Sequence, residues 1–353
     1  MEYSNKFNSS ILDYFLSVLQ ANLADPRAIY FLARTALKQR KAAQKRRLAF
    51  KEGVNVPPLM IFSVTNRCNL GCAGCYNEIR AGQTGKELET AEMLDILDQA
   101  GRLGVSIALF AGGEPLLRKD LFTLAASRKD MIFPVFTNGT AINEDIATRF
   151  AANRNIIPVI SLEGGGVATD LRRGPGTYAR LKNVFRELKG RGVLFGVSIT
   201  ATSENFEEIT GQAFISSLRS SGCRLFFYVE YVPVAHGTRD LVLGEARKKQ
   251  LISLMPGLDS KYKAVFITFP GNEELYGGCL ASGRGFVHVS PYGELEPCPF
   301  APYSDVSLRG TPLKEALASG FLEKLRANHG KFKETSGGCA LWSEREWVAS
   351  ILK

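Results

Sequence analysis

Three cysteines in one short run, Cys68, Cys72 and Cys75, carry the clearest chemical signal in this sequence. Cysteine thiolates are the usual ligands of iron–sulfur clusters, with one thiolate on each iron. Three thiolates can therefore hold a cube of four irons and leave one iron without a protein ligand. A small molecule can bind to that open iron and receive an electron. A zinc site is the alternative interpretation, but no histidine or fourth cysteine lies nearby to complete its tetrahedron.

A second motif, Ala111-Gly112-Gly113-Glu114-Pro115, follows the second predicted strand. Paired glycines let the backbone approach a ligand closely, and Glu114 can accept a hydrogen bond from a bound ammonium group. Taken alone, these residues are also typical of a turn. Their place one strand after the three cysteines favours a role in the same site.

Small polar side chains recur where the next predicted strands end. They are Thr137, Asn138, Ser161, Glu163, Thr200 and Asn205. Each alone is more typical of a helix cap or a turn than of a ligand contact. Their recurrence at successive strand ends nevertheless indicates a shared site.

Four charged or titratable residues are further candidates. Arg172 and Arg173 could each offer a guanidinium to a carboxylate. Glu230 and His236 are candidate catalytic residues at and after the sixth predicted strand, where they could move protons on a substrate. A buried, hydrogen-bonded structural role is equally compatible with both of them.

The elements that must position these residues are strands alternating with helices from residue 56 onward. The predicted strands are Leu59–Val64, Val105–Phe110, Met131–Phe136, Ile156–Ile160, Phe195–Thr200 and Arg224–Glu230. The predicted helices between them are Thr90–Leu103, Asn143–Asn153, Tyr178–Lys189 and Phe206–Arg219. Six such units predict an α/β fold with a parallel sheet and helices outside. Six strands leave an arc with an open side, and chemistry is expected at their carboxyl ends.

The order Cys-x3-Cys-x2-Cys, then the aromatic Tyr76, then Gly-Gly-Glu-Pro one strand later, resembles the radical S-adenosylmethionine (SAM) superfamily. The resemblance implies a (β/α)6 partial TIM barrel. It also implies an enzyme whose [4Fe-4S] cluster binds the amino and carboxylate groups of SAM. An electron from that cluster cleaves the sulfonium and gives a 5′-deoxyadenosyl radical.

The same resemblance implies roles for the residues around the barrel mouth. Tyr76 is assigned to the cofactor site. Gly112, Gly113 and Glu114 would meet the amino group of SAM, and the backbone near Val232 would hold its adenine. The polar residues at the strand ends, Thr137, Asn138, Ser161, Glu163, Thr200 and Asn205, would face its ribose and carboxylate. Arg173 is assigned to the carboxylate, with Arg172 as the other candidate.

A second set of cysteines, Cys279, Cys298 and Cys339, follows the predicted barrel. The segment between the first two predicts a β-hairpin that turns at Tyr292-Gly293, and short helices are expected at 312–318 and 321–328. This arrangement resembles the short form of the C-terminal extension called SPASM or twitch. The resemblance implies one auxiliary [4Fe-4S] cluster on these three cysteines, with its fourth ligand open. Cys223 could approach, but it is more typical of a buried small hydrophobe, and structural zinc is the alternative for this set.

Length and composition are compatible with such a protein. The chain has 353 residues with 45% hydrophobic content, enough for one large α/β unit and a smaller module. No apolar run reaches the length of a membrane span, and the N-terminal sequence lacks the pattern of a signal peptide. Seven cysteines without an export signal predict a cytoplasmic protein that uses thiols for metal ligation rather than for disulfides.

The net charge of +9 is concentrated in one segment. Eight basic residues and no acidic residue stand between Arg34 and Lys51. Apolar residues at helical spacing predict a helix over 11–23, and Asp25-Pro26 predicts the start of a second helix that runs to about Glu52. This basic arm is either a solvated helix packed on the barrel or a contact for an anionic membrane surface, an acidic substrate or a redox partner. Nothing in the sequence predicts nucleic-acid binding.

Together these observations predict three units: an N-terminal basic helical arm over residues 1–55, a radical SAM partial barrel over 56–262 and a small α+β twitch-like unit over 263–353. The expected activity is reductive cleavage of SAM and abstraction of hydrogen from a peptide side chain, a cofactor precursor or a lipid-like metabolite. A reducing partner such as flavodoxin or ferredoxin is implied. The alternative hypothesis is a non-catalytic iron–sulfur or zinc scaffold that binds partners through the basic arm.

Overall fold

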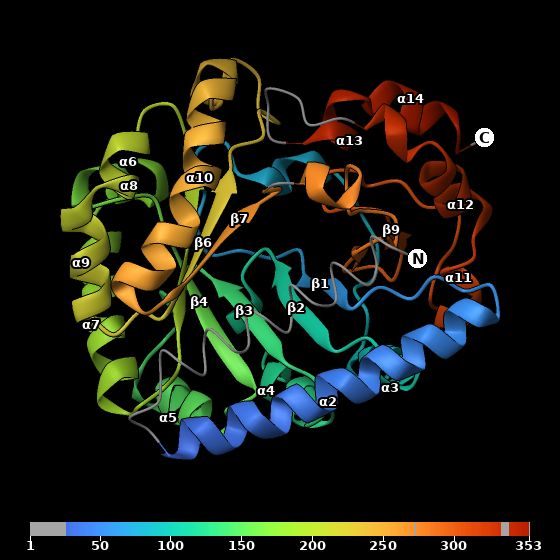
Figure 1. The fold of residues 1–353 in the computed structure, drawn as a ribbon, viewed down its shortest axis with the longest axis horizontal. Coiled ribbons are helices and arrows are strands. Elements are labelled where there is room, and N and C mark those ends of the chain that lie inside the picture. Colours follow the sequence, from blue (N-terminus) through green and yellow to red (C-terminus); the bar gives the residue numbers. More distant parts are fainter. Residues whose placement is uncertain (1–25, 272, 333–338, 353) are drawn as a thin grey trace.

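A parallel β-sheet forms the centre of the molecule (Figure 1). The computed structural model describes residues 26–271, 273–332 and 339–352. Within this part of the chain, nine strands make one sheet in the order β7-β6-β5-β4-β3-β2-β1-β8-β9. The strands are β1 Leu59–Thr65, β2 Ile107–Gly112, β3 Phe133–Thr137, β4 Ile156–Leu162, β5 Gly196–Ala201, β6 Leu225–Glu230, β7 Val265–Phe269, β8 Phe286–Val289 and β9 Leu295–Glu296. All neighbours from β7 to β8 are parallel, and only β9 runs antiparallel, to β8.

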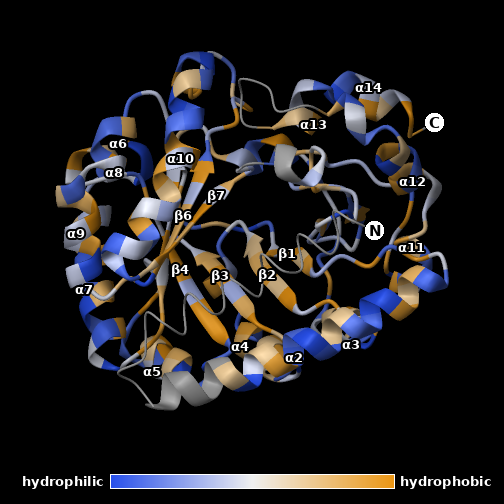
Figure 2. Cartoon of the chain, in the orientation of Figure 1, coloured by the Kyte–Doolittle hydropathy of each residue, from blue (hydrophilic) through white to orange (hydrophobic). Residues whose placement is uncertain are grey.

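Helices surround this curved sheet, whose strands are rich in apolar residues (Figure 2). They are α2 Pro26–Lys51, α3 Thr90–Leu103, α4 Leu121–Ala126, α5 Glu144–Ala152, α6 Gly166–Arg173, α7 Thr177–Gly190, α8 Phe206–Thr210, α9 Gln212–Ser220, α10 Glu245–Tyr262, α11 Leu313–Ala316, α12 Gly320–Ala327, α13 Ala340–Ser343 and α14 Arg345–Ser350. Helix α3 illustrates how the sequence specifies them. A capping box between Glu89 and Glu92 starts it, and it buries Met93, Ile96 and Leu97.

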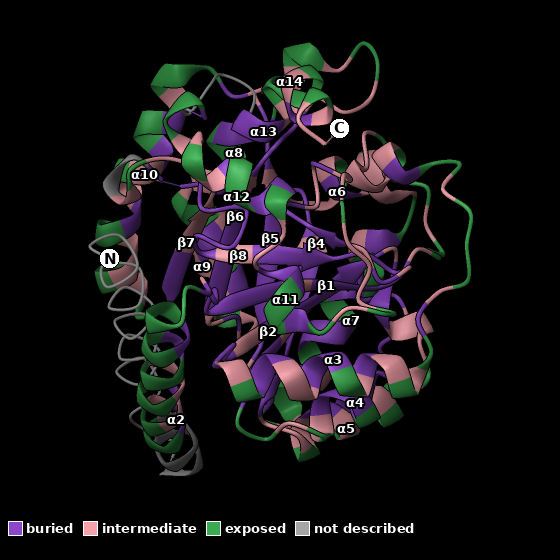
Figure 3. Ribbon diagram, turned by 90° about the vertical axis from the view of Figure 1, so that its right-hand side faces the viewer, coloured by how far each residue is buried: buried purple, intermediate pink, exposed green. Residues whose placement is uncertain are grey.

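The α/β partial-barrel fold predicted from the sequence is confirmed. All six predicted strands are present within two residues of their expected starts, and the hairpin joins β8 and β9 through Gly293, whose φ is +96°. Most residues of the strands are buried (Figure 3), because helices cover one face of the sheet and apolar side chains gather on the other. Strands β3 and β7 keep half-buried positions. Their near-continuous apolar sequences follow from this burial.

The sheet extends further than predicted, because the alternation of strands and helices does not stop at about Tyr262. Helix α10 leads into a seventh parallel strand, β7, and β8 pairs in parallel with β1. The sequence hid this unit because α10 contains Pro256 and lacks a regular apolar stripe. The division at residue 262 stays a prediction, although β7 and β8 hydrogen-bond to strands on the other side of it.

One predicted helix is divided in the structure. The helix expected over Phe206–Arg219 is two helices, α8 and α9, separated by Gly211 in an extended conformation with ψ 141°. Glycine is a poor helix former, which accounts for the break. The helix expected over 11–23 lies outside the described residues.

Helix α2 confirms the predicted basic helix almost to the residue. It lies along the amino-terminal edge of the sheet (Figure 1). Lys45 Nζ donates to Gly101 O at 2.8 Å and Arg46 to Gly104 O, and both carbonyls precede β2. Lys38 donates to Lys129 O, which precedes β3. None of the helices in the described part of the chain is both long and apolar enough to cross a membrane.

Candidate cofactor site at the barrel mouth

The loop that carries Cys68, Cys72 and Cys75 leaves the carboxyl end of β1 and is held there by polar contacts. Thr65 Oγ1 and Asn66 N donate to the Glu87 carboxylate at 2.9 and 2.7 Å. Arg118 Nη1 donates to Val64 O at 3.0 Å. These contacts fix residues 64–66, which precede Cys68 in the sequence.

Gly112 and Gly113 pack the end of β2 against the start of this loop. Gly113 N donates to Thr65 O at 2.8 Å, and Glu114 N donates to Arg67 O at 2.8 Å. A Cβ atom on either glycine would collide with one of these carbonyl groups, and Gly112 has a φ of +128°. The sequence predicted that the glycines admit a ligand, but the close neighbour that the structure places against them is protein backbone.

Glu114 is buried, with 1% of its surface exposed, and it joins the ends of β2 and β3. Its carboxylate accepts hydrogen bonds from Thr137 Oγ1 at 2.6 Å, Asn138 N at 2.7 Å and Leu116 N at 3.0 Å. Burial raises the pKa of Glu114, and these hydrogen bonds counter only part of that effect. Most of the capacity of Glu114 to accept hydrogen bonds is thus used within the protein.

The cysteine loop is also tied to the end of β3 through Asn69, a residue that the sequence analysis did not identify. Asn138 Nδ2 donates to Asn69 Oδ1 at 2.8 Å, and Asn69 Nδ2 donates to Thr140 Oγ1 at 2.9 Å. Thr137 and Asn138, both predicted site residues, therefore lie beside the loop. Asn69 could have been suspected because it lies between two of the cysteines.

Helix α6 approaches the loop from the opposite side through two arginines. Arg172 Nε donates to Ala73 O at 3.0 Å, and Arg172 Nη1 donates to Thr200 Oγ1 at 2.6 Å. Arg173 Nε donates to Glu163 Oε1 at 2.8 Å, while Arg173 Nη1 lies 4.0 Å from Cys72 Sγ. Glu163 also forms an ion pair with Arg172 at 2.8 Å. Four predicted residues, Glu163, Arg172, Arg173 and Thr200, are thus brought together at the mouth.

The charges around the cysteines suit a site for anionic sulfur. All three are free thiols; Cys68 is exposed, and Cys72 and Cys75 are half-buried. Burial raises the pKa of Cys72 and of Cys75, and the guanidinium groups of Arg172 and Arg173 oppose that increase. A cluster needs these thiols as thiolates. The positive charges of Arg172 and Arg173 would favour the thiolate form of these cysteines.

Tyr231, the residue that follows β6, closes this arrangement. It is 2% exposed, and its hydroxyl is a buried polar atom without a hydrogen-bond partner among the described residues. The hydroxyl lies against Gly74, whose φ is +61°, so that a side chain at 74 would collide with it. A buried hydroxyl without a partner is costly. Its place beside the cysteine loop therefore fits a site that receives a further polar group.

Two other predicted residues, Asn205 and Tyr76, use their polar side chains in hydrogen bonds to the protein backbone. Asn205 Nδ2 donates to the carbonyls of Glu163 and Thr200 at 2.7 and 2.8 Å, and its Oδ1 accepts from Thr202 N at 2.8 Å. Tyr76 donates to Gly112 O at 3.1 Å, and burial raises the pKa of Tyr76 to about 12. Ser161 is half-buried and Val232 is buried.

The two candidate catalytic residues are not in similar surroundings. Glu230 is 4% exposed and forms an ion pair at 3.7 Å with Lys248, which is also buried. His236 is exposed on the loop after β6. The structure thus gives Glu230 a buried charged partner, in keeping with the structural role that the sequence left open for it.

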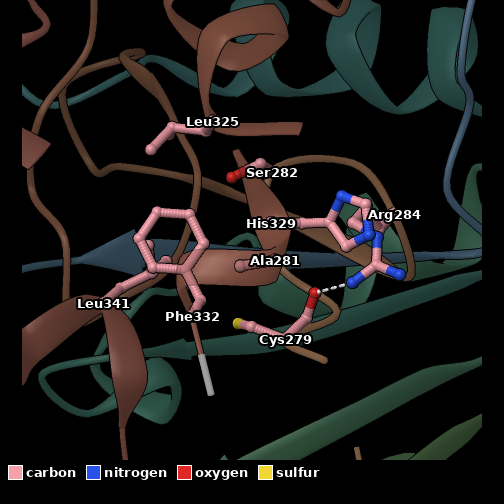
Figure 4. A pocket seen from close by; sticks show the side chains of 8 residues that line it. All are labelled: Cys279, Ala281, Ser282, Arg284, Leu325, His329, Phe332 and Leu341. Carbon is pink, nitrogen blue, oxygen red and sulfur yellow. Dashed lines mark hydrogen bonds between the residues drawn. The ribbon is translucent and has the colours of Figure 1, made fainter. Parts of the chain in front are cut away.

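The second cysteine set is gathered in space although it is spread over the sequence. Cys279, Cys298 and Cys339 are 9%, 6% and 9% exposed. A hydrogen bond with Cys339 and burial raise the pKa of Cys298, while burial and then the nearby charges of Glu273 and Cys339 raise the pKa of Cys279. Cys279 lines a small pocket with His329 and Phe332, and Arg284 Nη1 donates to its carbonyl at 2.5 Å (Figure 4). Each thiol therefore lies near another member of the set.

Two further observations bear on metal ligation. Cys223 is fully buried in the hydrophobic core, and burial raises its pKa; this is the environment of a small hydrophobe. Among the residues described, no three His, Cys, Asp or Glu side chains are grouped so that they could hold a metal ion.

Known proteins resemble this chain in sequence. A model of the radical SAM superfamily matches residues 62–210. Pre-heme d1 synthase of Dinoroseobacter shibae is 26% identical over 322 residues, which cover 80% of this chain and 79% of the relative. Mycofactocin maturase MftC of Mycobacterium tuberculosis is 27% identical over 308 residues, which cover 82% of this chain and 76% of the relative.

The fold is also shared with solved structures. SuiB of Streptococcus suis, bound to S-adenosylmethionine, matches with a TM-score of 0.66 at 16% identity and covers 91% of this chain and 78% of its own. A parallel partial barrel with a three-cysteine loop at its mouth is the design of radical SAM enzymes, and this chain belongs to the radical SAM superfamily. It is an enzyme, and the family implies a [4Fe-4S] cluster and SAM as its cofactors.

Proposed function

We propose that Cys68, Cys72 and Cys75 hold the SAM-binding [4Fe-4S] cluster of an enzyme that abstracts hydrogen from its substrate. The observation that carries this proposal is the loop itself. Its three free thiols are fixed from β1, β2, β3 and α6, and around them lie two guanidinium groups and a buried hydroxyl that has no partner among the described residues. When bound, the cluster supplies the electron that cleaves SAM to a 5′-deoxyadenosyl radical. The protein fixes the geometry and excludes water.

The residues around the loop would orient SAM. Arg173 is the better candidate for its carboxylate, because Arg173 reaches to 4.0 Å from Cys72 Sγ while Arg172 is committed to Ala73 O and Thr200. Glu163 holds both guanidinium groups in place. The remaining predicted contacts, Tyr76, Gly112, Gly113, Glu114, Thr137, Asn138, Ser161, Asn205 and Val232, are part of the same proposal, as are proton transfers by Glu230 and His236.

The proposal includes one auxiliary [4Fe-4S] cluster on Cys279, Cys298 and Cys339, in a C-terminal unit of the SPASM/twitch type. Its support is the burial of all three thiols and the side-chain hydrogen bond between Cys298 and Cys339. Cys223 is not proposed as a fourth ligand, because it lies in the hydrophobic core.

For the substrate, the proposal takes the classes named by the relatives. MftC is named a mycofactocin maturase, and a relative from Xanthomonas oryzae is named a PqqA peptide cyclase. Two other relatives are named pre-heme d1 synthase and AdoMet-dependent heme synthase. A peptide side chain or a cofactor precursor is therefore proposed. A cytoplasmic location and reduction by a flavodoxin or ferredoxin complete the proposal.

Replacing Cys72 by alanine tests the first cluster. Anaerobically reconstituted protein is mixed with dithionite and SAM, and 5′-deoxyadenosine is measured. We expect the nucleoside from the wild type and from Cys223→Ala, a matched control with a cysteine outside both sets, and none from Cys72→Ala. Equal yields from wild type and Cys72→Ala, or no product from a cluster-loaded wild type, would contradict the proposal.

Counting iron and sulfide tests the auxiliary cluster. A chain with two cubane clusters carries about eight irons, and one with a single cluster carries about four. We expect about eight in the wild type and about four in Cys298→Ala, whose first cluster remains. A wild type with about four irons would refute the auxiliary cluster and leave the first one standing.

A further inference from the structure

A buried polar network joins the barrel to the C-terminal hairpin. It consists of Ser63 on β1, Arg80 at the end of the 3-10 turn Tyr76–Arg80, His288 on β8 and Glu296 on β9. The four residues are 3%, 1%, 0% and 2% exposed. His288 Nε2 lies 2.7 Å from Ser63 Oγ, and His288 Nδ1 lies 2.7 Å from Glu296 Oε2. Arg80 binds both oxygens of Glu296, Nη1 to Oε1 at 2.9 Å and Nη2 to Oε2.

This network is not a catalytic relay, although a serine, a histidine and a carboxylate follow one another in it. Such a relay needs a nucleophile that a substrate can reach. Ser63 and His288 are covered by the sheet, and the Glu296 carboxylate is neutralised by a bidentate arginine rather than directed at the histidine alone. The contacts therefore hold segments in place.

The segments that it joins are those of the two cysteine sets. Ser63 lies on the strand that leads into the first cysteine loop, and Arg80 ends the turn that leaves it. Glu296 and Pro299 stand on either side of Cys298, and Arg80 Nη2 also donates to Pro299 O at 3.3 Å. One guanidinium thus binds both flanks of Cys298 while it belongs to the segment that starts at Cys75.

We propose that Arg80 is a positioning residue that fixes the separation and orientation of the two iron–sulfur clusters. The inference rests on the proposed function, because it requires a cluster at each cysteine set. Arginine suits this task because its planar guanidinium makes several hydrogen bonds of fixed direction at once. No group of the network needs to touch SAM or substrate for this effect.

The magnetic coupling between the two reduced clusters tests the proposal, because dipolar coupling depends on distance and orientation. Electron paramagnetic resonance spectra are compared for full-length wild type, Arg80→Met and Arg80→Lys, each reconstituted and analysed for iron. We expect a shifted or lost spin–spin splitting in both variants, with the smaller change in Arg80→Lys, which keeps the charge and is the variant expected to fold. Arg128→Met is the matched control, because Arg128 pairs with Asp98 and Asp130 at the amino-terminal edge of the sheet; its spectrum should equal that of the wild type.

The outcomes separate the two proposals. A wild type with about eight irons whose coupling is unchanged in Arg80→Lys and Arg80→Met would overturn the role of Arg80 and leave the clusters in place. A change in Arg128→Met as large as in Arg80→Met would also overturn it, since any lost ion pair would then suffice. A wild type with about four irons would overturn the auxiliary cluster, and this inference with it.

Discussion

Gly74 and Tyr231 come from distant parts of the chain and meet at the first cysteine set. Gly74 has a φ of +61°, and its missing side chain leaves the space that the Tyr231 hydroxyl occupies. Cys72 and Cys75 lie on either side of this glycine. The position of two proposed cluster ligands therefore depends on a residue without a side chain and on the ring that packs against it.

We predict that Gly74→Ala lowers the iron content of the reconstituted protein. The left-handed backbone costs alanine roughly 1–2 kcal/mol, and its Cβ collides with the Tyr231 hydroxyl. The double variant Gly74→Ala/Tyr231→Phe removes the colliding oxygen and should regain part of the iron, while Tyr231→Phe alone should load normally. Iron per chain is the measurement. Equal iron in the single and double Gly74 variants would contradict the contact.

Glu163 supports a second prediction at this scale, because it is 2% exposed and binds two arginines. Glu163→Ala leaves two guanidinium groups without their carboxylate, and breaking a buried ion pair costs about 3–5 kcal/mol. Glu187→Ala is the control, since it removes only a surface pair between Glu187 on α7 and Arg191 just after that helix, worth about 0.5 kcal/mol or less. Urea unfolding of both variants measures the difference. Similar losses of unfolding free energy in the two variants would show that the ion pairs of Glu163 stabilise the fold no more than a surface pair does.

Helix α10 and strand β7 give a prediction at the scale of elements. Asp259 Oδ1 accepts a hydrogen bond from Phe266 N at 2.8 Å and so joins the helix to the strand. Burial raises the pKa of Asp259 from 3.8 to about 6. The folded state thus binds this proton more tightly than the unfolded chain does, and the contribution of Asp259 to stability falls as the pH rises through this interval.

Asp259→Asn keeps an oxygen acceptor for Phe266 N but removes the titration. We therefore expect the stability of the variant relative to the wild type to rise between about pH 3.8 and pH 6 and to level off above that range. Urea unfolding at several pH values in this range is the measurement. A stability difference that does not change with pH would show that the folded and unfolded pKa values of Asp259 are alike.

The same elements show what a sequence can predict and why. The six strands were predictable because apolar runs bounded by turn residues are a local signal, and the site was predictable as a place because parallel strands share their carboxyl ends. Helix α10 was hidden by Pro256, and the short helix α6 begins in a run of glycines. Contacts such as Tyr231 with Gly74 depend on the curvature of the sheet, which no local pattern records. For the same reason, the sequence could not show that Glu114 and Asn205 are occupied by hydrogen bonds within the fold.

At the scale of the whole molecule, the C-terminal part is built into the sheet. β7 pairs with β6, and β8 pairs with β1. A chain that ends at Tyr262 lacks β7 and β8 and would therefore leave β6 and β1 as open edges. We expect that chain to aggregate and to lack cooperative unfolding. A chain that ends at Phe332 retains β7, β8 and β9 and should stay folded, although it loses Cys339. Soluble yield and urea unfolding are the measurements, and cooperative unfolding of the shorter chain would contradict the prediction.

Helix α2 lies at the amino-terminal edge of the sheet, while every proposed SAM contact lies at the carboxyl edge. Access to the proposed SAM site and binding to the basic helix α2 would therefore take place at opposite ends of the protein. A partner bound to α2 would leave the proposed SAM site accessible, so the partner would not have to dissociate between turnovers.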